Sequence, residues 1–497
     1  MSIIQVKDLT FSYGTDLIFD HVSLNLDTSW KLGLIGRNGK GKTTFLKLLL
    51  KELDYQGTIF SKEEFSYFPY QMKQKDDLVI NIADNICPNV YEWQIIQEFS
   101  KLKLKEEVLY QPFNTLSNGE QTKVLIALMF LNEDRFLLLD EPTNYLDIEG
   151  KKLICEYLKG KQGFILVSHD RYLLDQVVDH ILAINRSTIE VVQGNFSSWY
   201  HNKQLKDHYE LEKNLKIKKE MKRLNDSKNE KVIWSNIVEK SKIGSKGDKG
   251  YIGHKAAKMM QLSKNIERRQ ENLISEKKKL LQDIEETESL KMQSLESNYQ
   301  SLFTLEDVSI FNDHKKIIDS ISFQIQPHDR IWLIGNNGSG KSSILKLIVG
   351  DCHLKYCGKI NGHDHLKISY IPEDTSFLKG TLQNFIDEYE INESLFKTIL
   401  RKLDFKREYF EMRLDEYSEG MKKKVLIAKS LSEEAHLYVW DEPLNYIDLF
   451  SRIQIEEVLL EYQPTLIFVC HDETFGCNVA TKVINLNEND LLLNCKK

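Results

Sequence analysis

The sequence predicts an α/β protein built from two copies of one nucleotide-binding unit that are joined by a long antiparallel helical hairpin. Three observations lead to this fold class: a phosphate-binding loop that occurs twice, continuously apolar segments that follow each loop, and a highly charged segment without proline between the copies. The chain has 497 residues, of which 41% are hydrophobic, so two or three packed domains are expected.

The phosphate-binding loop has the pattern Gly-x-x-x-x-Gly-Lys-Thr/Ser in both copies. Each loop follows an apolar run and opens a helical pattern, which is the strand–loop–helix setting of a P-loop. Its backbone N–H groups surround phosphates, its lysine adds positive charge, and its hydroxyl reaches Mg²⁺. We therefore expect two bound ATP molecules, each with Mg²⁺. The predicted ATP-binding residues of the two loops are Gly36, Arg37, Asn38, Gly39, Lys40, Gly41, Lys42, Thr43 and Thr44, and Gly335, Asn336, Asn337, Gly338, Ser339, Gly340, Lys341, Ser342 and Ser343.

Further motifs recur at an offset of about 300 residues, which makes the chain an internal tandem repeat. Residues 136–140 and 164–168 of the first copy, and 437–441 and 465–470 of the second, are almost continuously apolar. Such runs are typical of strands that are buried on both faces of a parallel sheet. The repeat predicts one domain over residues 1–196 and a second over residues 301–497.

The segment between the copies, residues 197–300, is rich in helix-forming residues and has apolar positions at helical spacing. Four glycines interrupt the pattern within residues 240–253, so two antiparallel helices with a tip in that range are expected. Residues 201–280 contain 22 basic and 11 acidic residues, which gives this stretch about +11 against a net charge of −7 for the whole chain. A basic projection of this kind suits RNA phosphate.

Composition excludes several classes of protein. The sequence has no apolar run of membrane-spanning length and no signal-peptide pattern at Met1, so we expect a cytoplasmic protein without a membrane domain. The seven cysteines have no paired Cys-x-x-Cys spacing and predict neither a zinc site nor a disulfide framework.

Three motifs after each P-loop, taken in order, resemble the signature loop, the Walker B and D-loop segment, and the switch histidine of the ABC ATPases. In the first copy they occupy residues 116–121, 137–147 and 168–170, and in the second copy residues 417–421, 439–448 and 470–472. At the ends of buried strands, Asp140 and Asp441 are placed to hold Mg²⁺ together with the P-loop hydroxyls of Thr43 and Ser342. The alternative for any one of these polar residues alone is a simple helix cap.

The expected catalytic residues are the two glutamates that follow the Walker B aspartates and the two switch histidines. Glu141 and Glu442 would orient or deprotonate the attacking water, and His169 and His471 would contact the γ-phosphate. Hydrolysis of ATP is therefore the predicted reaction.

The ABC resemblance also implies that each signature loop contacts the nucleotide of the opposite copy. Ser418 and Gly420 would then face Lys42, and Ser117 and Gly119 would face Lys341. Glu419 and Met421 depart from the usual signature sequence. Of the remaining nucleotide contacts, Gln71 is the Q-loop candidate of the first copy, Glu373 replaces glutamine in the second, Tyr13 is expected to stack on adenine, and Phe311 fits that role less well.

The tandem layout and the segment Asp140–Asp147, with the sequence Asp-Glu-Pro-Thr-Asn-Tyr-Leu-Asp, resemble the ABC-F family of ribosome-binding ATPases. The short build and the sequences around the tip are similar to Vga/Lsa-type antibiotic-resistance proteins. This resemblance implies a monomer whose linker enters the E site of the 70S ribosome, beside 23S rRNA and the P-site tRNA, and protects translation from lincosamides, pleuromutilins and streptogramins A. The expected ribosome-contacting residues are Lys240, Lys242, Ile243, Lys246, Lys249, Tyr251, Ile252, Lys255 and Lys258.

Three alternatives to this function stay open at the level of sequence. The chain could be a translation factor of the same family without a drug role, or the ATPase subunit of a transporter with a separate membrane partner. A DNA-associated ABC ATPase is disfavoured, because such proteins carry their coiled coil inside one nucleotide-binding domain. The alternative for the tip residues is that they form a solvated loop that binds no target.

Overall fold

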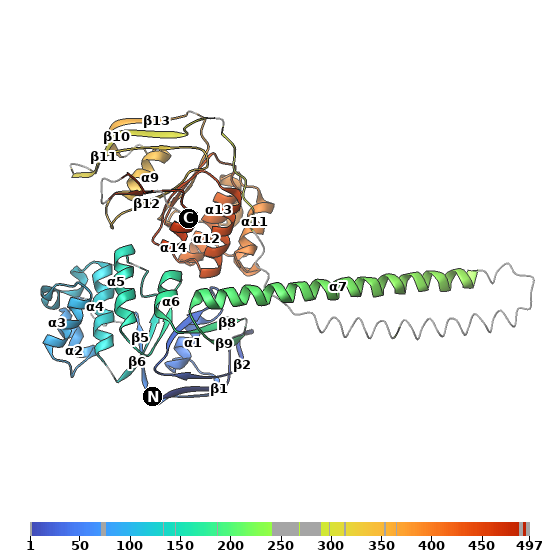
Figure 1. Ribbon diagram of the computed structural model, residues 1–497, viewed down its shortest axis with the longest axis horizontal. Helices are drawn as coiled ribbons and strands as arrows, with labels where there is room; N and C mark the ends of the chain where they lie inside the picture. Colours follow the sequence, from blue (N-terminus) through green and yellow to red (C-terminus); the bar gives the residue numbers. More distant parts are fainter. Residues whose placement is uncertain are drawn as a thin grey trace, which may run out of the picture. The chain divides into compact units, whose positions relative to one another are not determined.

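The structure is a computed structural model, which describes residues 2–70, 76–132, 134–144, 146–185, 187–240, 268, 290–297, 299–312, 315–351, 354–363, 365–486 and 491–493. The chain divides into two compact units. One unit contains residues Met1–Ser197 and Thr287–Lys497, here called the first half and the second half, and the other is the linker segment Ser198–Glu286. Figure 1 shows the first half in blue to cyan and the second half in yellow to red.

Each half contains a small antiparallel sheet and a larger, mainly parallel sheet. In the first half the strand orders are β2-β1-β4 and β5-β6-β7-β3-β8-β9, with only β9 antiparallel to its neighbour in the larger sheet. The strands are β1 (Ile3–Tyr13), β2 (Asp16–Asp27), β3 (Lys31–Ile35), β4 (Gln56–Phe60), β5 (Glu64–Phe68), β6 (Arg135–Asp140), β7 (Phe164–Val167), β8 (His180–Asn185) and β9 (Thr188–Gln193).

The second half repeats this topology, with strand orders β11-β10-β13 and β14-β15-β16-β12-β17-β18. Its strands are β10 (Phe303–Asn312), β11 (Lys315–Ile325), β12 (Arg330–Ile334), β13 (Lys355–Gly362), β14 (Ile368–Ile371), β15 (Leu437–Asp441), β16 (Leu466–Val469), β17 (Lys482–Asn485) and β18 (Leu491–Leu493). The apolar runs of the sequence become the central strands β6, β7, β15 and β16, whose apolar side chains are all buried. The predicted parallel sheets are thus confirmed.

Helices join the strands and cover the sheets (Figure 1). Those of the first half are α1 (Lys42–Leu49), α2 (Val79–Ile86), α3 (Glu92–Lys101), α4 (Asn118–Leu131), α5 (Ile148–Lys159) and α6 (Arg171–Val177), with short 3₁₀ turns at Glu106–Tyr110 and Phe113–Thr115. Those of the second half are α9 (Lys341–Val349), α10 (Leu382–Glu388), α11 (Glu393–Lys402), α12 (Glu419–Ser432), α13 (Leu449–Tyr462) and α14 (Glu473–Val479), with 3₁₀ turns at Arg407–Glu411 and Leu414–Glu416.

The P-loop helix is central to the core of each half. Phe45, Leu46, Leu48 and Leu49 of α1 belong to one buried cluster with apolar residues from both sheets of the first half. The corresponding residues of α9 occupy the same place in the second half. Burial of this helix fixes the position of the loop that precedes it, because its apolar face must pack between the two sheets.

The linker begins with α7 (Phe196–Lys240), a helix of 45 residues that ends where the tip was expected to start. Apart from Arg268, the second expected helix and the tip lie outside the described residues. Leu290 and Met292 already belong to the core of the second half, although the linker was expected to extend to residue 300. Among the described helices, none is both long and apolar enough to cross a membrane.

Candidate nucleotide-binding sites

Both P-loops have the backbone geometry that a phosphate cradle requires. Gly41 and Gly340 cap α1 and α9 with φ angles of 98° and 91°, in the left-handed region that favours glycine. A Cβ at Gly340 would lie 2.7 Å from Ile318 Cδ1, so a side chain has no room there. Each loop therefore presents the N-terminus of a helix, where free N–H groups and the helix dipole favour an anion.

The P-loop lysines fold back over their own loops. Lys42 Nζ donates to the carbonyl of Gly36 at 2.8 Å, and Lys341 Nζ donates to the carbonyls of Gly335 and Asn336 at 2.8 and 2.9 Å. Burial lowers the pKa of both ammonium groups. Each lysine is thus positioned beside the helix N-terminus, where its charge adds to the dipole.

The hydroxyl that follows each lysine contacts the Walker B aspartate. Thr43 Oγ1 donates to Asp140 Oδ2 at 2.9 Å, and Ser342 hydrogen-bonds Asp441 in the second half. In the first half Tyr67 adds a donor that the sequence analysis missed, since its hydroxyl also lies 2.9 Å from Asp140 Oδ2. Hydroxyl and carboxylate oxygens are ligands that Mg²⁺ prefers, so these pairs are suited to hold it.

The two glutamates next to these aspartates share an uncommon backbone conformation. Glu141 and Glu442 have φ angles of 50° and 46°, and each backbone N–H donates to a neighbouring strand, to the carbonyls of Val167 and Val469. Left-handed backbone at residues other than glycine is costly and clusters at functional sites. Its occurrence at the same position in both halves indicates that the direction of this side chain matters.

Each glutamate lies beside the switch histidine of its own half. His169 Nε2 lies 3.3 Å from Glu141 Oε1, and His471 Nε2 lies 3.1 Å from Glu442 Oε1. Burial raises the pKa of both glutamates to about 7 and lowers the pKa of His471 to about 4. Burial also lowers the pKa of His169 well below its ordinary value. Near neutral pH each pair therefore combines a neutral imidazole with a carboxyl group that can take up or release a proton.

The larger of the two cavities at these sites, about 910 Å³, is lined by both halves. The second half contributes its P-loop, Asp441, Glu442 and His471, and the first half contributes Ser117 and Gly119 of its signature loop. Lys341 of the second half and Ser117 and Gly119 of the first half therefore line the same cavity, as the crossed arrangement predicts. The P-loop residues that line this cavity are Asn336, Asn337, Gly338, Gly340, Lys341, Ser342 and Ser343, whereas Gly335 and Ser339 do not line it.

The smaller cavity, about 340 Å³, is lined by the first half alone. Its lining includes Tyr13, Asp140, Glu141, His169 and the P-loop residues Asn38, Gly39, Gly41, Lys42, Thr43 and Thr44, but not Gly36, Arg37 or Lys40. Neither Ser418 nor Gly420 reaches this cavity in the structure.

The second half still contacts the first P-loop through its D-loop. Asn38 Nδ2 donates to the carbonyl of Tyr446 at 3.2 Å. A Cβ on Gly420 would lie 2.6 Å from this same carbonyl oxygen. Tyr446 thus lies between Gly420 of the second signature loop and Asn38 of the first P-loop, and the expected pairing of Lys42 with Ser418 and Gly420 is not formed in this structure.

The residues present fit Mg·ATP. Asp441 Oδ1 and Glu442 Oε2 are buried without a hydrogen-bond partner in the described part of the chain, whereas Glu442 Oε1 lies 3.1 Å from His471 Nε2; both acidic residues line the larger cavity. Unpaired buried oxygens are costly, so a ligand that satisfies them is expected. Lys341 and the helix N-terminus provide the positive counterpart for phosphates.

The unusual carboxylates of the second half are compensated locally. Glu419 accepts hydrogen bonds from Thr375 at 2.5 Å and from Lys422 at 3.0 Å, and the Thr375 bond, with Lys422, lowers its pKa. Its charge therefore points back to its own half. Glu373 lines the larger cavity, and the buried Lys423 lies nearby, with its Nζ 3.0 Å from the carbonyl of Pro372.

Some expectations lie outside the described residues or away from the cavities. Gln71 is not described, and neither are Lys242, Ile243, Lys246, Lys249, Tyr251, Ile252, Lys255 and Lys258. Lys240 is the last residue of α7. Phe311 does not line the larger cavity, where Ile317 is found instead.

A comparison with protein-family models finds the ABC transporter family at residues 19–144 and 318–445, slightly more than half of the chain. The chain belongs to the ABC transporter family. The two matched regions coincide with the two P-loop halves, so this protein carries a tandem pair of ABC ATPase domains, which implies ATP binding and hydrolysis.

Curated relatives extend over nearly the whole chain. It is 27% identical to the ribosome protection protein VmlR of Bacillus subtilis, over 95% of this chain and 84% of that protein. It is 28% identical to the erythromycin resistance ATP-binding protein MsrA of Staphylococcus epidermidis, over 95% and 96% of the two chains. It is also 29% identical to the ATP-binding protein Uup of Buchnera aphidicola, over 97% and 80%. Tandem ABC domains and relatives of this kind are consistent with an ABC-F ATPase.

Solved structures show the same fold. The chain superposes with a TM-score of 0.62 on the archaeal ribosome recycling factor aABCE1 in its complex with the ribosomal stalk protein aP1, at 19% identity and over 96% of this chain and 87% of that one. A structure of RNase-L inhibitor gives a TM-score of 0.61. At this identity the likeness concerns the tandem ABC architecture.

Proposed function

We propose that this ABC protein is an ATP-driven, ribosome-binding protein of the ABC-F type that protects translation from antibiotics. The observation that carries the proposal is the larger cavity, in which a P-loop of one half faces the signature loop of the other. ATP bound there would contact both halves and hold them together, and its hydrolysis would release them. The protein would act as a monomeric clamp.

Each site would hydrolyse ATP with its own set of side chains. Glu141 or Glu442 takes the proton of the attacking water, and its left-handed backbone aims the carboxylate into the cavity. The neutral imidazole of His169 or His471 is placed to donate to the γ-phosphate, and the lysine and helix N-terminus stabilise its charge. Thr43 with Asp140, and Ser342 with Asp441, would hold Mg²⁺, whose charge would offset that of the phosphates.

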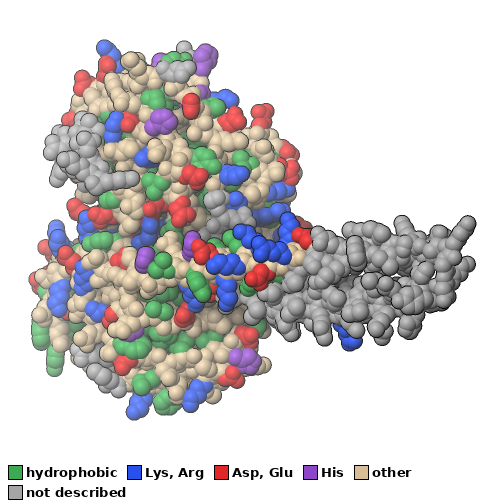
Figure 2. Space-filling view, turned by 45° about the vertical axis from the view of Figure 1, so that its right-hand side comes forward, with side chains coloured by type: hydrophobic (Ala, Val, Ile, Leu, Met, Phe, Trp, Pro, Cys, Tyr) green, Lys and Arg blue, Asp and Glu red, His purple; other side chains and the backbone are tan. Residues whose placement is uncertain are grey.

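In this proposal the linker is the part of the protein that recognises the target. Residues 201–280 carry about +11, whereas the rest of the chain carries about −18, since the total is −7. On the face shown in Figure 2, basic and acidic side chains are interspersed over both halves. A basic segment on an otherwise acidic protein favours RNA phosphate as its partner. Closure of the clamp would orient this segment for the ribosomal E site, with its tip directed towards the peptidyl-transferase centre.

The drug role rests on two relatives, of which VmlR is named a ribosome protection protein and MsrA an erythromycin resistance ATP-binding protein. We propose lincosamides, pleuromutilins and streptogramins A as the antibiotics opposed. The action would be displacement of the drug by the linker tip or by the rearrangement that the tip imposes on the peptidyl-transferase centre.

Ribosome pelleting tests the clamp. A variant with Glu141→Gln and Glu442→Gln should bind ATP without hydrolysing it and should cosediment with 70S ribosomes in ATP but not in ADP. The matched control adds Lys42→Ala and Lys341→Ala, which remove nucleotide binding and should abolish cosedimentation. Double-glutamine protein that stays in the supernatant with ATP would contradict ribosome binding.

Growth of a drug-sensitive bacterial host tests the drug role separately. Expression of the wild-type protein should raise the inhibitory concentrations of the three proposed drug classes, with a macrolide included for comparison. Ribosome binding without any rise would favour the housekeeping translation factor, and ATP-dependent binding to membranes instead of ribosomes would favour the transporter subunit.

A further inference from the structure

A single ammonium group connects the two switch-histidine segments. Lys151, in the first turns of α5 in the first half, donates from Nζ to the backbone carbonyl of His471 in the second half at 2.8 Å. The same Nζ lies 3.2 Å from Oδ2 of Asp170, the residue that follows His169. The side chains of Lys151 and Asp170 are only 14% and 6% exposed, so this bridge is largely shielded from water.

The end of the bridge that lies in the first half is fixed by other contacts. Asp170 caps α6 by accepting a hydrogen bond from the backbone N–H of Leu173, and its own N–H donates to Ser168 Oγ. Lys151 directly follows Gly150, which lines the larger cavity together with Asp147. The ammonium group is therefore held by the first half at the edge of the second ATP site.

His471 is held on one side of its ring by Glu442, whose Oε1 lies 3.1 Å from Nε2, and through its backbone carbonyl by Lys151. Its ring Nδ1 is buried without a hydrogen-bond partner in the described part of the chain. A switch histidine is usually oriented by a partner on the nitrogen that does not face the substrate. Because Nδ1 has no such partner, the backbone contributes to the direction of the ring, and the backbone carbonyl is the atom that Lys151 binds.

The second half carries a corresponding cation. Arg452, on α13, donates from Nη1 to Oδ2 of Asp472 at 3.0 Å and from Nε to the carbonyl of Ile447 at 3.0 Å. After burial and Lys42, its charge makes the next contribution to the lowered pKa of His169 in the first half. In both halves, then, a cation that follows the D-loop pairs with the aspartate after the switch histidine of its own half, Lys151 with Asp170 and Arg452 with Asp472. Each of these cations also acts on the switch histidine of the other half.

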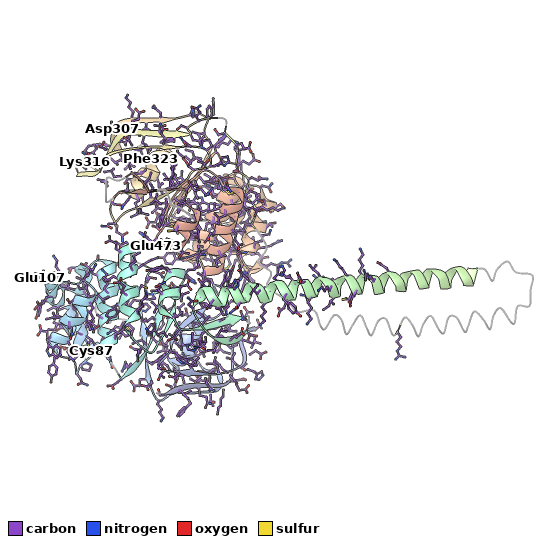
Figure 3. All side chains as sticks on the ribbon, in the orientation of Figure 1. Cys87, Glu107, Asp307, Lys316, Phe323 and Glu473 are labelled. Atoms are coloured by element: carbon purple, nitrogen blue, oxygen red, sulfur yellow. The ribbon has the colours of Figure 1, made fainter. Side chains whose placement is uncertain are left out.

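Two further ion pairs join helices α5 and α6 of the first half to helices of the second half. Arg171 of α6 pairs with Glu456 of α13, and Lys152 of α5 pairs with Glu473 of α14 at 3.0 Å. Figure 3 labels Glu473 on the side of the second half that contacts the first. Lys152 is 48% exposed, in contrast to Lys151, which makes it a matched control on the same helix.

We propose that Lys151 is a positioning residue of the second ATP site that acts from the first half, holding His471 in place and linking its position to the switch segment of the first site through Asp170. A charge-assisted hydrogen bond to a backbone carbonyl is stronger than a neutral one and directional. Movement of the Asp170 segment at the first site would shift the ammonium and, with it, the histidine of the second. The inference rests on the ATPase activity and not on the ribosome, so it is tested without ribosomes.

The test uses the full chain with Glu141→Gln, so that only the second site hydrolyses ATP. Lys151→Met should lower kcat about tenfold, the loss expected for one charge-assisted hydrogen bond, while KM for ATP stays within about twofold. Lys151→Arg should recover most of the rate because it keeps a donor, and Lys152→Met should leave the rate unchanged. Equal effects of Lys151→Met and Lys152→Met would overturn the proposal, as would a loss of nucleotide binding in Lys151→Met, which indicates damage to the fold.

Coupling is measured by changing the first site. With Lys151 present, the rate of the second site should differ between Glu141→Gln, whose first site retains ATP, and Lys42→Ala, whose first site cannot bind it. In the Lys151→Met background the two rates should become equal. A difference that persists unchanged in that background would show that communication does not pass through Lys151.

Discussion

Replacement of Glu442 by glutamine should remove a loss of stability that the second half undergoes as the pH rises to neutral, in addition to stopping hydrolysis there. Glu442 is 5% exposed, its Oε2 has no hydrogen-bond partner in the described structure, and its Oε1 lies 3.1 Å from His471 Nε2. Burial raises the pKa of Glu442 from 4.5 to about 7. The folded state therefore binds this proton more tightly than the unfolded state, and stability falls as the pH rises from 4.5 to 7.

The size of the effect follows from the shift. A pKa difference of this size corresponds to about 3 kcal/mol of stability lost between pH 4.5 and 8. Glutamine has no charge to lose, so Glu442→Gln lacks this decline. A domain of this size changes its Tm by about 2–4 °C per kcal/mol, so the Tm difference between variant and wild type should grow by about 5–10 °C from pH 5 to pH 8.

Thermal unfolding without nucleotide, followed from pH 5 to pH 8, is the assay. A constant offset between the proteins reflects the hydrogen-bond needs of the amide and is not part of the prediction, which concerns only the change with pH. Glu107→Gln, at an exposed carboxylate in the first half that Figure 3 labels, is the control and should show no such change. A Tm difference for Glu442→Gln that is the same at pH 5 and pH 8 would refute the reasoning.

Two further predictions compare matched positions. Gly340→Ala should abolish nucleotide binding at the second site, because the added Cβ would collide with Ile318. Gly350 also has a positive φ but has open space around it, so Gly350→Ala should cost only about 1 kcal/mol of stability and keep nucleotide binding. Equal nucleotide binding in titrations of the two variants would contradict this prediction. Tyr67→Phe removes a hydrogen-bond donor to Asp140 and should lower stability by about 1 kcal/mol. Tyr370→Phe removes a buried hydroxyl that has no partner in the described structure, so its effect on stability should be neutral or favourable. Equal Tm shifts of the two variants would argue against the roles given to these hydroxyls.

The two ATP sites are not equivalent in charge. Glu373 lies at the second site, and Lys423 is buried near it, where the first half has Thr122. Glu419, which departs from the usual signature sequence, is held by Thr375 and Lys422. The negative charge that Glu419 brings to the second signature loop is therefore paired with Lys422, which directly follows this loop.

Local sequence was sufficient to predict the repeated parallel sheets and the P-loops. Continuous apolar runs have to be buried on both faces, and a Gly-x-x-x-x-Gly-Lys pattern between a strand and a helix has one stable geometry. The ends of β6 and β15 at Asp140 and Asp441 follow from the same patterns, since the first polar residue ends each buried run. The partner of Asp140 at Tyr67 did not follow, because a tyrosine in a strand gives no sign of which carboxylate it will meet.

Contacts between the halves could not be read from the sequence in the same way. Ser117 and Gly119 were assigned to the opposite site by resemblance to a family, and only the folded chain brings them to the cavity of Lys341. Lys151 and Arg452 lie outside the recurring motifs, and the contacts of Lys151 with His471 and of Tyr446 with Asn38 join residues 320 and 408 positions apart. Periodicity and loop patterns act over a few residues and so determine each half by itself, whereas the way one half completes the site of the other depends on packing between surfaces, which only the tertiary structure decides.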